Sequence, residues 1–308
     1  MNVPTPPSSS LFDRLPLSAN LRGALCFIVG TAFLVTNDTL VKLQSTEMPI
    51  GQLIFVRGWF AVAFTLLACW SLGALDHLKD LSNREVMARA GVNAVSMFTY
   101  MAALIHMPIA NVATIMQVIP LALTAASGLL LAERVGVRRW TAVAVGFFGV
   151  LIVIRPGPEG FNVWALSALL TVALVVTRDL ITRSVSADIP SILITLASAI
   201  AVLISAGVYS ATEEWAELTP SNVSVLIASA GFLTIGIHLL IVAVRTGELS
   251  VVVPFRYLLV VWAMISGYLV WDELPDRWAL FGIALVVGSG IYTVRREARV
   301  RRMAAEKD

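Results

Sequence analysis

The chain has 308 residues and a formal net charge of +2, and 58% of its residues are hydrophobic whereas only 14% are charged. Soluble domains carry about 25% charged residues, and a chain of this size could not bury so much apolar surface in a water-soluble core. The composition therefore excludes an ordinary soluble protein and indicates an integral membrane protein embedded in a lipid bilayer.

The first 20 residues are rich in Pro and Ser and lack the basic start and the small-residue cleavage site of a signal peptide. We interpret 1–20 as a disordered cytoplasmic tail. Ten apolar stretches follow, most of them near the roughly 20 residues that a helix needs to cross the hydrocarbon core. These stretches lie at 21–43, 50–71, 86–105, 109–131, 139–155, 162–182, 190–210, 223–244, 250–271 and 278–294. We therefore expect an all-α integral membrane fold with ten transmembrane helices.

The positions of the basic residues predict the orientation of these helices. With the N-terminus inside, the inner segments hold most bases, including Arg89, whereas the outer loops hold only Arg155 and Arg277, with Lys42 near an outer helix end. This bias predicts that both termini lie in the cytoplasm. We expect the membrane to be a bacterial inner membrane. The basic tail at 297–308 is expected to stop at the inner membrane face rather than to bind nucleic acid.

A short charged motif occurs once in each half of the chain. The segments 36–42 and 177–183 both have the pattern Thr-x-Asp-x-x-x-base. An acid four residues before a base lies on the same helical face and can pair with it there. A charge near the bilayer centre costs roughly 2.5–3.5 kcal/mol on insertion scales, so these charges need a structural or functional reason.

The two copies of the motif predict inverted repeats. Asp38 falls toward the outer end of its span and Asp179 toward the inner end of its own. Five spans in each half is an odd number, so the second copy must enter the membrane upside down, which explains the exchange of sides. We expect a first repeat at 21–157 and a second at 158–296, an arrangement common in secondary carriers.

Longer stretches resemble a known family. They are 37–42, 52–58, 139–157, 254–257 and 273–276. Together they make the chain similar to EamA-type members of the drug/metabolite transporter superfamily, which have ten helices in two inverted five-helix repeats. The Asn-Asp-x-x-x-Lys, Pro-x-Arg-Tyr and Glu-x-Pro-Asp pieces resemble those of S-adenosylmethionine uptake permeases, and riboflavin carriers of alphaproteobacteria have the same architecture. The resemblance implies transport of a small-molecule substrate.

Arginines inside the spans are the first candidates for substrate binding. Arg57 in span two could hold a carboxylate or phosphate with its planar fork, or it could only neutralise Asp38 between two helices. Arg256 and Tyr257 follow Pro254, which loosens the local backbone. Together they offer a guanidinium group for an acidic substrate group and an aromatic ring for stacking.

The remaining binding candidates have stronger structural alternatives. Asp179 and Arg178 could line the site, although both lie close to the inner end of their span. Trp59 and Tyr100 could stack on a flat substrate, but packing or interface anchoring is the default for each ring. His238 is a candidate polar group of the cavity.

Four further residues are candidates for coupling or gating. Asp38 with Lys42 could be a proton-coupling carboxylate or a structural pair, and the sequence cannot decide between burial and the nearby base. Glu133 and Glu273 lie at helix ends on the inner and outer sides, respectively. We expect these two glutamates to form gate or interface salt bridges, and we name a proton as the candidate coupling ion.

Other function classes have little support in the sequence. A membrane enzyme would need a nucleophile or metal constellation, and none is found; Cys26 and Cys69 are interpreted as apolar fillers, and no cofactor or metal is expected. Charges staggered between the two sides disfavour a channel.

We predict a secondary transporter that moves an anionic or zwitterionic metabolite by alternating access, such as an S-adenosylmethionine-like molecule, an amino acid or a vitamin such as riboflavin. A non-transporting receptor or a structural membrane protein is the alternative.

Overall fold

The computed structural model describes residues 18–130, 136–155, 162–186, 188–246 and 248–305. Within these ranges all regular secondary structure is helical. Nine of the described helices are long and apolar enough to cross a membrane. The protein is therefore a multi-pass helical membrane protein.

The helices follow the ten expected stretches closely. Their bounds are α1 (Ala19–Gln44), α2 (Ile50–Ser71), the 3₁₀ helix η2 (Ala74–Ser82), α3 (Arg84–His106), α4 (Ile109–Met116), α5 (Ile119–Leu130), α6 (Val137–Ile154), α7 (Val163–Ser184), α8 (Ser191–Ser210), α9 (Pro220–Thr246), α10 (Leu249–Val252), the 3₁₀ helix η3 (Val253–Tyr257), α11 (Leu258–Trp271) and α12 (Arg277–Ala305). Of the ten stretches, α3 alone is absent from the nine apolar helices of the described chain.

Two of the expected spans are interrupted. The fourth breaks between α4 and α5, at Gln117 and Val118, and the ninth breaks at η3, around Pro254. The two breaks touch each other, because the Gln117 side-chain amide donates to the backbone carbonyl of Arg256 at 2.9 Å. A backbone group released by a helix break inside a membrane needs such a partner, so each interruption helps to stabilise the other.

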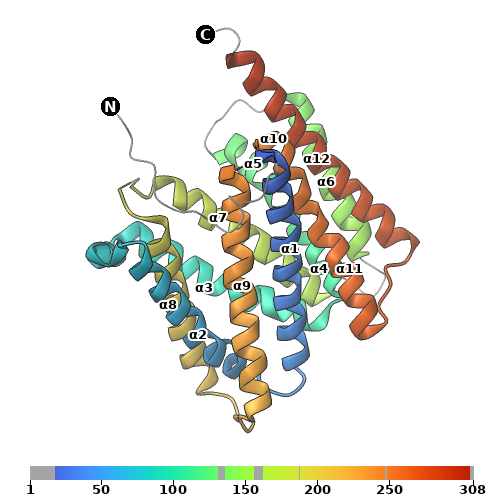
Figure 1. The fold of residues 1–308 in the computed structure, drawn as a ribbon. Coiled ribbons are helices and arrows are strands. Elements are labelled where there is room, and N and C mark those ends of the chain that lie inside the picture. The colour runs from blue at the N-terminus through green and yellow to red at the C-terminus, as the bar shows by residue number, and fades with distance from the viewer. Residues whose placement is uncertain (1–17, 131–135, 156–161, 187, 247, 306–308) are drawn as a thin grey trace.

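The helices pack in pairs across the chain: α1 lies along α9, α3 along α7, α2 along α8 and α6 along α12 (Figure 1). Two of these pairs approach closely at facing glycines. A methyl group at Gly30 would meet the carbonyl oxygen of Gly236 at 3.1 Å, and Gly149 faces Gly282 in the same way. Small residues at such crossings allow membrane helices to pack backbone against backbone.

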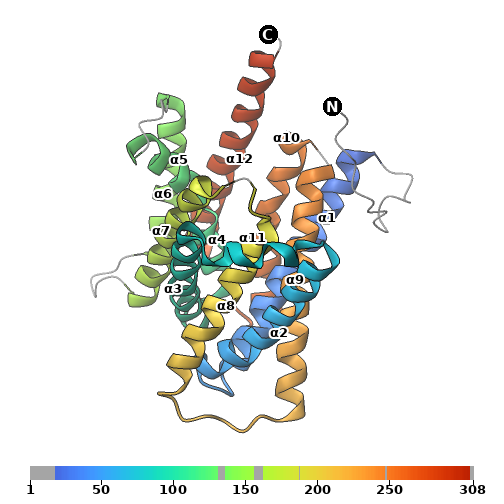
Figure 2. The same cartoon turned by 90° about the vertical axis from the view of Figure 1, so that its left-hand side faces the viewer.

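The start of α1 and the end of α12 lie at one end of the bundle, which we call the terminal end, and the loop joining α8 to α9 lies at the other, the far end (Figures 1 and 2). The first buried apolar cluster is concentrated toward the far end. It includes Val41 near the end of α1, Leu53 in the first turn of α2, Leu104 near the end of α3 and Leu226 early in α9. This cluster therefore packs the far-end parts of α1, α2, α3 and α9 against one another.

Candidate functional site

A cavity of about 390 Å³ lies between α2, α3, α7, α8 and α9. It runs from mid-bundle toward the terminal end, since its walls include the later part of α2 and the first turns of α3 and α8. Its polar lining residues are Arg57, Thr65, Arg89, Asn93, Arg178, Thr195, Ser198, Thr234 and His238. The remaining lining residues are apolar or small, so polar groups of net positive charge face an otherwise apolar space.

Arg57 joins the cavity to a buried polar cluster. Its Nη1 donates to Asn37 Oδ1 at 3.1 Å, and the same oxygen accepts from the Ser229 hydroxyl at 2.8 Å. Asn37 in turn donates to Asp38 at 2.9 Å, and the Tyr100 hydroxyl donates to the other carboxylate oxygen at 2.6 Å. The cluster ties α1, α2, α3 and α9 together and holds Arg57 at the cavity wall. Tyr100 is thus a hydrogen-bond donor to Asp38 in this arrangement.

The expected pairing of Asp38 with Lys42 is wrong. Asp38 takes its hydrogen bonds from Asn37 and Tyr100, whereas Lys42 Nζ donates to the carbonyl of Met107 at 2.7 Å and lies 3.8 Å from Glu273 Oε1. The two side chains share a helical face, but facing helices offer each of them a better-placed partner. Tertiary contacts here outweigh an (i, i+4) pair that is worth only about 0.2–0.5 kcal/mol.

The second copy of the motif behaves in the same way. Arg178 donates to Asp179 through Nε and Nη2 at 3.0 and 2.9 Å, and through Nη1 to Asn93 Oδ1 on α3 at 3.0 Å. Arg183 instead contacts the Ser127 hydroxyl of α5 at 3.3 Å. Arg178 therefore lines the cavity with Asp179 beside it, and the expected pairing of Asp179 with Arg183 is replaced by an ion pair with the adjacent residue.

Arg89 is a cavity residue that the sequence analysis missed, because it was counted among the bases flanking the membrane. Its Nε donates to the Thr182 hydroxyl of α7 at 2.7 Å, and its Nη1 donates to the Ser198 hydroxyl of α8 at 2.7 Å. The available signal was its position inside α3, a full turn beyond Arg84. Thr195 and Ser198 also line the cavity.

Arg256 and Tyr257 lie in η3, at the point where the two helix breaks meet. The guanidinium of Arg256 is half-buried and has no hydrogen bond or ion pair within the described chain. Tyr257 is 3% exposed, and its hydroxyl has no partner among the described groups.

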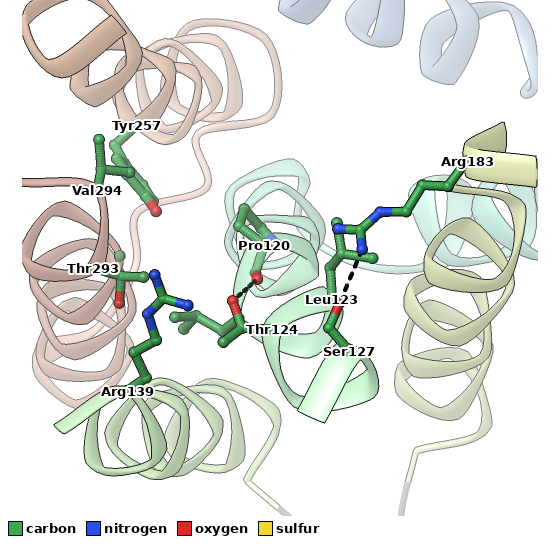
Figure 3. Close-up of a pocket in the computed structure, with 11 residues that line it drawn as sticks. Pro120, Leu123, Thr124, Ser127, Arg139, Arg183, Tyr257, Thr293 and Val294 are labelled. Carbon is green, nitrogen blue, oxygen red and sulfur yellow. Dashed lines mark hydrogen bonds between the residues drawn. The ribbon is translucent and has the colours of Figure 1, made fainter. Parts of the chain in front are cut away.

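Tyr257 lines a second cavity, of about 220 Å³, toward the terminal end of α5, α7 and α12. In Figure 3, Arg139 reaches from α6 toward Thr293 and Tyr257, whereas Arg183 reaches Ser127 from α7 on the other side of α5. The structure therefore separates Tyr257 from Arg57 and Arg178, which line the first cavity.

Two aromatic or imidazole candidates differ in position. The Trp59 ring is 58% exposed and meets Phe55 edge-on at a centroid distance of 6.1 Å, outside both cavities. Its place on the outer face of α2 fits contact with lipid, which is a common role for tryptophan in membrane proteins. His238 is exposed in the isolated chain and contributes to the wall of the first cavity on α9.

Polar contacts hold the far end together at two places. Lys42 is 7% exposed and lies over the ring of Trp271, 4.7 Å from its centroid, in addition to its contacts with Glu273 and Met107. We call Lys42 and Glu273 the far-end ion pair. Glu133, the expected counterpart of Glu273 at the other end, falls outside the described residues.

The second contact connects α2 to the loop between α8 and α9. The Glu213 carboxylate accepts from the backbone N–H groups of Gly51 and Gln52 at 3.1 and 3.0 Å, at the N-terminus of α2. The Gln52 side chain exchanges two hydrogen bonds of 2.8 Å with the backbone of Ala216. Negative charge is favourable at a helix N-terminus, so Glu213 stabilises this closure electrostatically as well.

Comparison with known proteins agrees with this architecture. Residues 21–155 match the EamA-like transporter family. The riboflavin transporter of Rhizobium johnstonii is 26% identical over 92% of this chain and 94% of its own length. The S-adenosylmethionine uptake transporter of Rickettsia conorii is 23% identical over 92% and 96%, and the pseudopaline exporter CntI of Pseudomonas aeruginosa is 25% identical over 86% and 93%.

The fold is also similar to that of a solved crystal structure, with a TM-score of 0.60 and 18% identity over 89% of this chain and 98% of the other. The first half of the chain carries the EamA-like domain, and the relatives that align with nearly the whole chain are named as transporters. The protein is therefore a transporter whose residues 21–155 carry an EamA-like transporter domain.

Proposed function

We propose that the protein is a secondary carrier that moves a small organic anion or zwitterion by alternating access. In this proposal ten transmembrane helices form two inverted repeats, 21–157 and 158–296, in a bacterial inner membrane with both termini in the cytoplasm. The concentration of bases at the terminal end supports this orientation.

The packing of the helices supports the repeat. Exchanging the two halves turns the α1–α9 pair into α7–α3, and it turns the α2–α8 and α6–α12 pairs into themselves. The interrupted segments also correspond, since α4–α5 in the first half matches α10–η3–α11 in the second. Interrupted helices at matching places in two repeats are typical of the substrate region of secondary transporters.

The observation that carries the proposal is the cavity built from both halves, with Arg57 and Arg178 on its walls. It extends toward the terminal end, whereas the far end is held by the Lys42–Glu273 ion pair and by Glu213 on the start of α2. This asymmetry is what one state of an alternating-access cycle requires. We propose Glu273 and Glu133 as gating residues, Asp38 as the candidate proton-coupling carboxylate, and Arg256 as a further candidate for binding the acidic part of the substrate.

The names of the relatives support an organic metabolite as the substrate. They refer to riboflavin, S-adenosylmethionine and pseudopaline, and they include uptake transporters and an exporter. Because molecules and directions differ among relatives of similar identity, we propose the class and leave the direction to experiment. The arginines of the cavity favour a substrate with an acidic group.

A competition panel in proteoliposomes tests this proposal. Uptake and efflux of labelled riboflavin, S-adenosylmethionine and amino acids are measured for the unchanged chain, for Arg57→Gln and for Arg84→Gln. Arg84 is an exposed base at the start of α3 and serves as the matched control. We expect Arg57→Gln to lower transport at least about tenfold, because a charged hydrogen bond is worth about 1.5–3 kcal/mol.

The control is expected to transport like the unchanged chain. Equal transport by Arg57→Gln and Arg84→Gln at equal reconstitution would show that this cavity does not bind the substrate. No transport by the unchanged chain of any compound in the panel, in either direction, would favour the receptor or structural alternative.

A further inference from the structure

Arg89 differs from the other two arginines of the cavity in what surrounds its charge. Arg178 forms an ion pair with Asp179 at 2.9 Å. Arg57 reaches Asn37, which itself donates to Asp38, so a carboxylate lies one hydrogen bond behind it. The partners of Arg89 are the two hydroxyls already described and the carbonyl of Ile194 at 3.5 Å, all of them uncharged.

No carboxylate lies within ion-pair distance of Arg89 in the described part of the chain. Among the described residues, the cavity wall has three guanidinium groups, and two carboxylates lie close to them, Asp38 and Asp179. The positive charges thus exceed the acids by one, and Asp179 is bonded to Arg178 rather than to Arg89. An unbalanced charge is costly inside a membrane protein, so intramembrane ionisable groups usually serve a ligand or an ion pathway.

The hydroxyl partners fix the guanidinium plane of Arg89 from two helices. With Nε held by Thr182 and Nη1 by Ser198, Nη2 has no hydrogen-bond partner among the described residues, and Arg89 is half-buried on the cavity wall. A guanidinium group that is already oriented loses little side-chain entropy when an anion binds to it. The arrangement provides one directed donor group and one unit of charge.

Apolar side chains form most of the surface beside Arg89. They come from α2, α3, α8 and α9 and include Ile54, Met97, Ile192, Val202, Leu233 and Ile237. A volume of about 390 Å³ lies in the range of pockets that bind small organic molecules, about 300–1,000 Å³.

We propose that Arg89 binds the single carboxylate of an organic monoanion whose apolar body lies along the α8 and α9 walls of the cavity. This inference rests on the proposed transport function and names the residue and the substrate charge for it. One unbalanced guanidinium matches one carboxylate, whereas a phosphate monoester brings a charge of about −1.5 to −2 at neutral pH. Arg57 and Arg178 each have an acid nearby, so Arg89 sets the preference for a carboxylate, while Arg57 and Arg178 belong to the polar wall that the substrate contacts.

Binding of acid and amide pairs to the purified full chain tests the proposal. The probes are indole-3-acetate with indole-3-acetamide, benzoate with benzamide, and hexanoate with hexanamide, because the members of each pair differ in charge but hardly in shape. Titration calorimetry is performed on the unchanged chain, on Arg89→Gln and on the control Arg84→Gln. We expect at least one acid to bind about tenfold more tightly than its amide to the unchanged chain and to the control.

In Arg89→Gln the acid and amide affinities are expected to agree within about twofold, because the balancing charge is gone. Retention of the acid preference in Arg89→Gln, or the absence of any preference in the unchanged chain, would overturn the proposal. Should Arg89→Gln fail to fold, Ser198→Ala removes one of the two hydroxyls that orient the guanidinium. This variant is expected to weaken the acid preference about threefold, and an unchanged preference would count against the inference.

The outcomes separate this inference from the transport function. One outcome is that Arg57→Gln loses transport while Arg89→Gln keeps the preference for the acid over the amide. This outcome would leave the carrier proposal in place and exclude only the role of Arg89. Unchanged transport in Arg57→Gln would remove the cavity as transport site, whatever the acid preference.

Discussion

Asp276, in the loop before α12, both caps a helix and forms an ion pair. Its carboxylate accepts from the backbone N–H groups of Trp278 and Ala279 at 3.1 and 2.9 Å, and so caps the first turn of α12. It also pairs with Arg155, which ends α6 in the left-handed conformation at φ 47°. The Arg155 hydrogen bond and then the N–H of Ala279 hold the pKa of Asp276 below its ordinary value of 3.8.

A pH dependence follows from this lowered pKa. Because the folded pKa of Asp276 is lower than the unfolded one, ionised Asp276 stabilises the fold above the unfolded value of 3.8. That contribution is lost as the pH falls through the folded pKa. Thermal unfolding in detergent should therefore show that Asp276→Asn lowers the unfolding temperature at pH 7, with a difference that shrinks toward pH 3.

Asp76→Asn is the control for this measurement, since Asp76 is exposed on η2 and makes no hydrogen bond or ion pair within the described chain. It should unfold like the unchanged protein over the whole pH range. A constant difference between Asp276→Asn and the unchanged chain from pH 7 to pH 3 would contradict a stabilising role of the ionised carboxylate.

Side-chain partners were the part of the site that the sequence could not predict. The (i, i+4) spacing correctly places Asp38 and Lys42 on one helical face, but Tyr100 and Glu273 from other segments become their partners. The place of Arg89 on the cavity wall was not predicted for a similar reason. A base near a helix start looks like an interface anchor until the neighbouring helices place Ser198 beside it.

At the scale of helices, facing glycines define how closely α1 and α9 approach. We predict that Gly236→Leu destabilises the protein by about 1–3 kcal/mol, because a side chain there meets the carbonyl of Gly30 at 3.1 Å and the side chain of Leu34 at 3.1 Å. Gly231→Leu on the same helix is the matched control, since a side chain there meets nothing within 4 Å. Thermal unfolding in detergent compares the two variants.

The control also separates packing from helix propensity. Leucine is a better helix former than glycine, so Gly231→Leu should leave stability unchanged or raise it slightly. An equal loss of stability in both variants would mean that the glycines matter for some reason other than close approach.

The helix segments themselves were largely predictable, because apolar stretches near 20 residues long have few alternatives in a bilayer. Pro254 indicated that the ninth stretch would be loosened, and a 3₁₀ segment is found there. The break at Gln117 was not predicted, although Pro120 just beyond it was a usable signal. Its position depends on the contact with Arg256, which is remote in sequence.

At the scale of the whole molecule, two polar closures lie at the far end, and the arginine cavity extends toward the terminal end. The sequence predicted charges at corresponding places in two halves, but it could not predict which end is closed. That property depends on contacts between segments distant in sequence, such as Gln52 with Ala216. It is also the property that a carrier must reverse during transport.

The far-end ion pair offers a direct test of that reversal. Glu273→Gln removes the negative partner of buried Lys42 but keeps the hydrogen bond to Met107 and the contact with Trp271. Lys42 then has no balancing acid within ion-pair distance in the described chain, so the closed far end should become less stable by about 1.4 kcal/mol. The far end should therefore open about ten times more often.

A third cavity, of about 410 Å³, lies beside Glu273 at the far end, and the buried Ala110 is among its lining residues. Opening is measured with a cysteine at Ala110 in a chain whose native cysteines are replaced. A membrane-impermeant thiol reagent applied from the far side should modify this cysteine about tenfold faster in Glu273→Gln, because modification tracks the open fraction when opening is fast. Glu214→Gln, at an exposed acid of the same end, should not change the rate. Equal rates in the two variants would mean that the Lys42–Glu273 ion pair does not hold the far end closed.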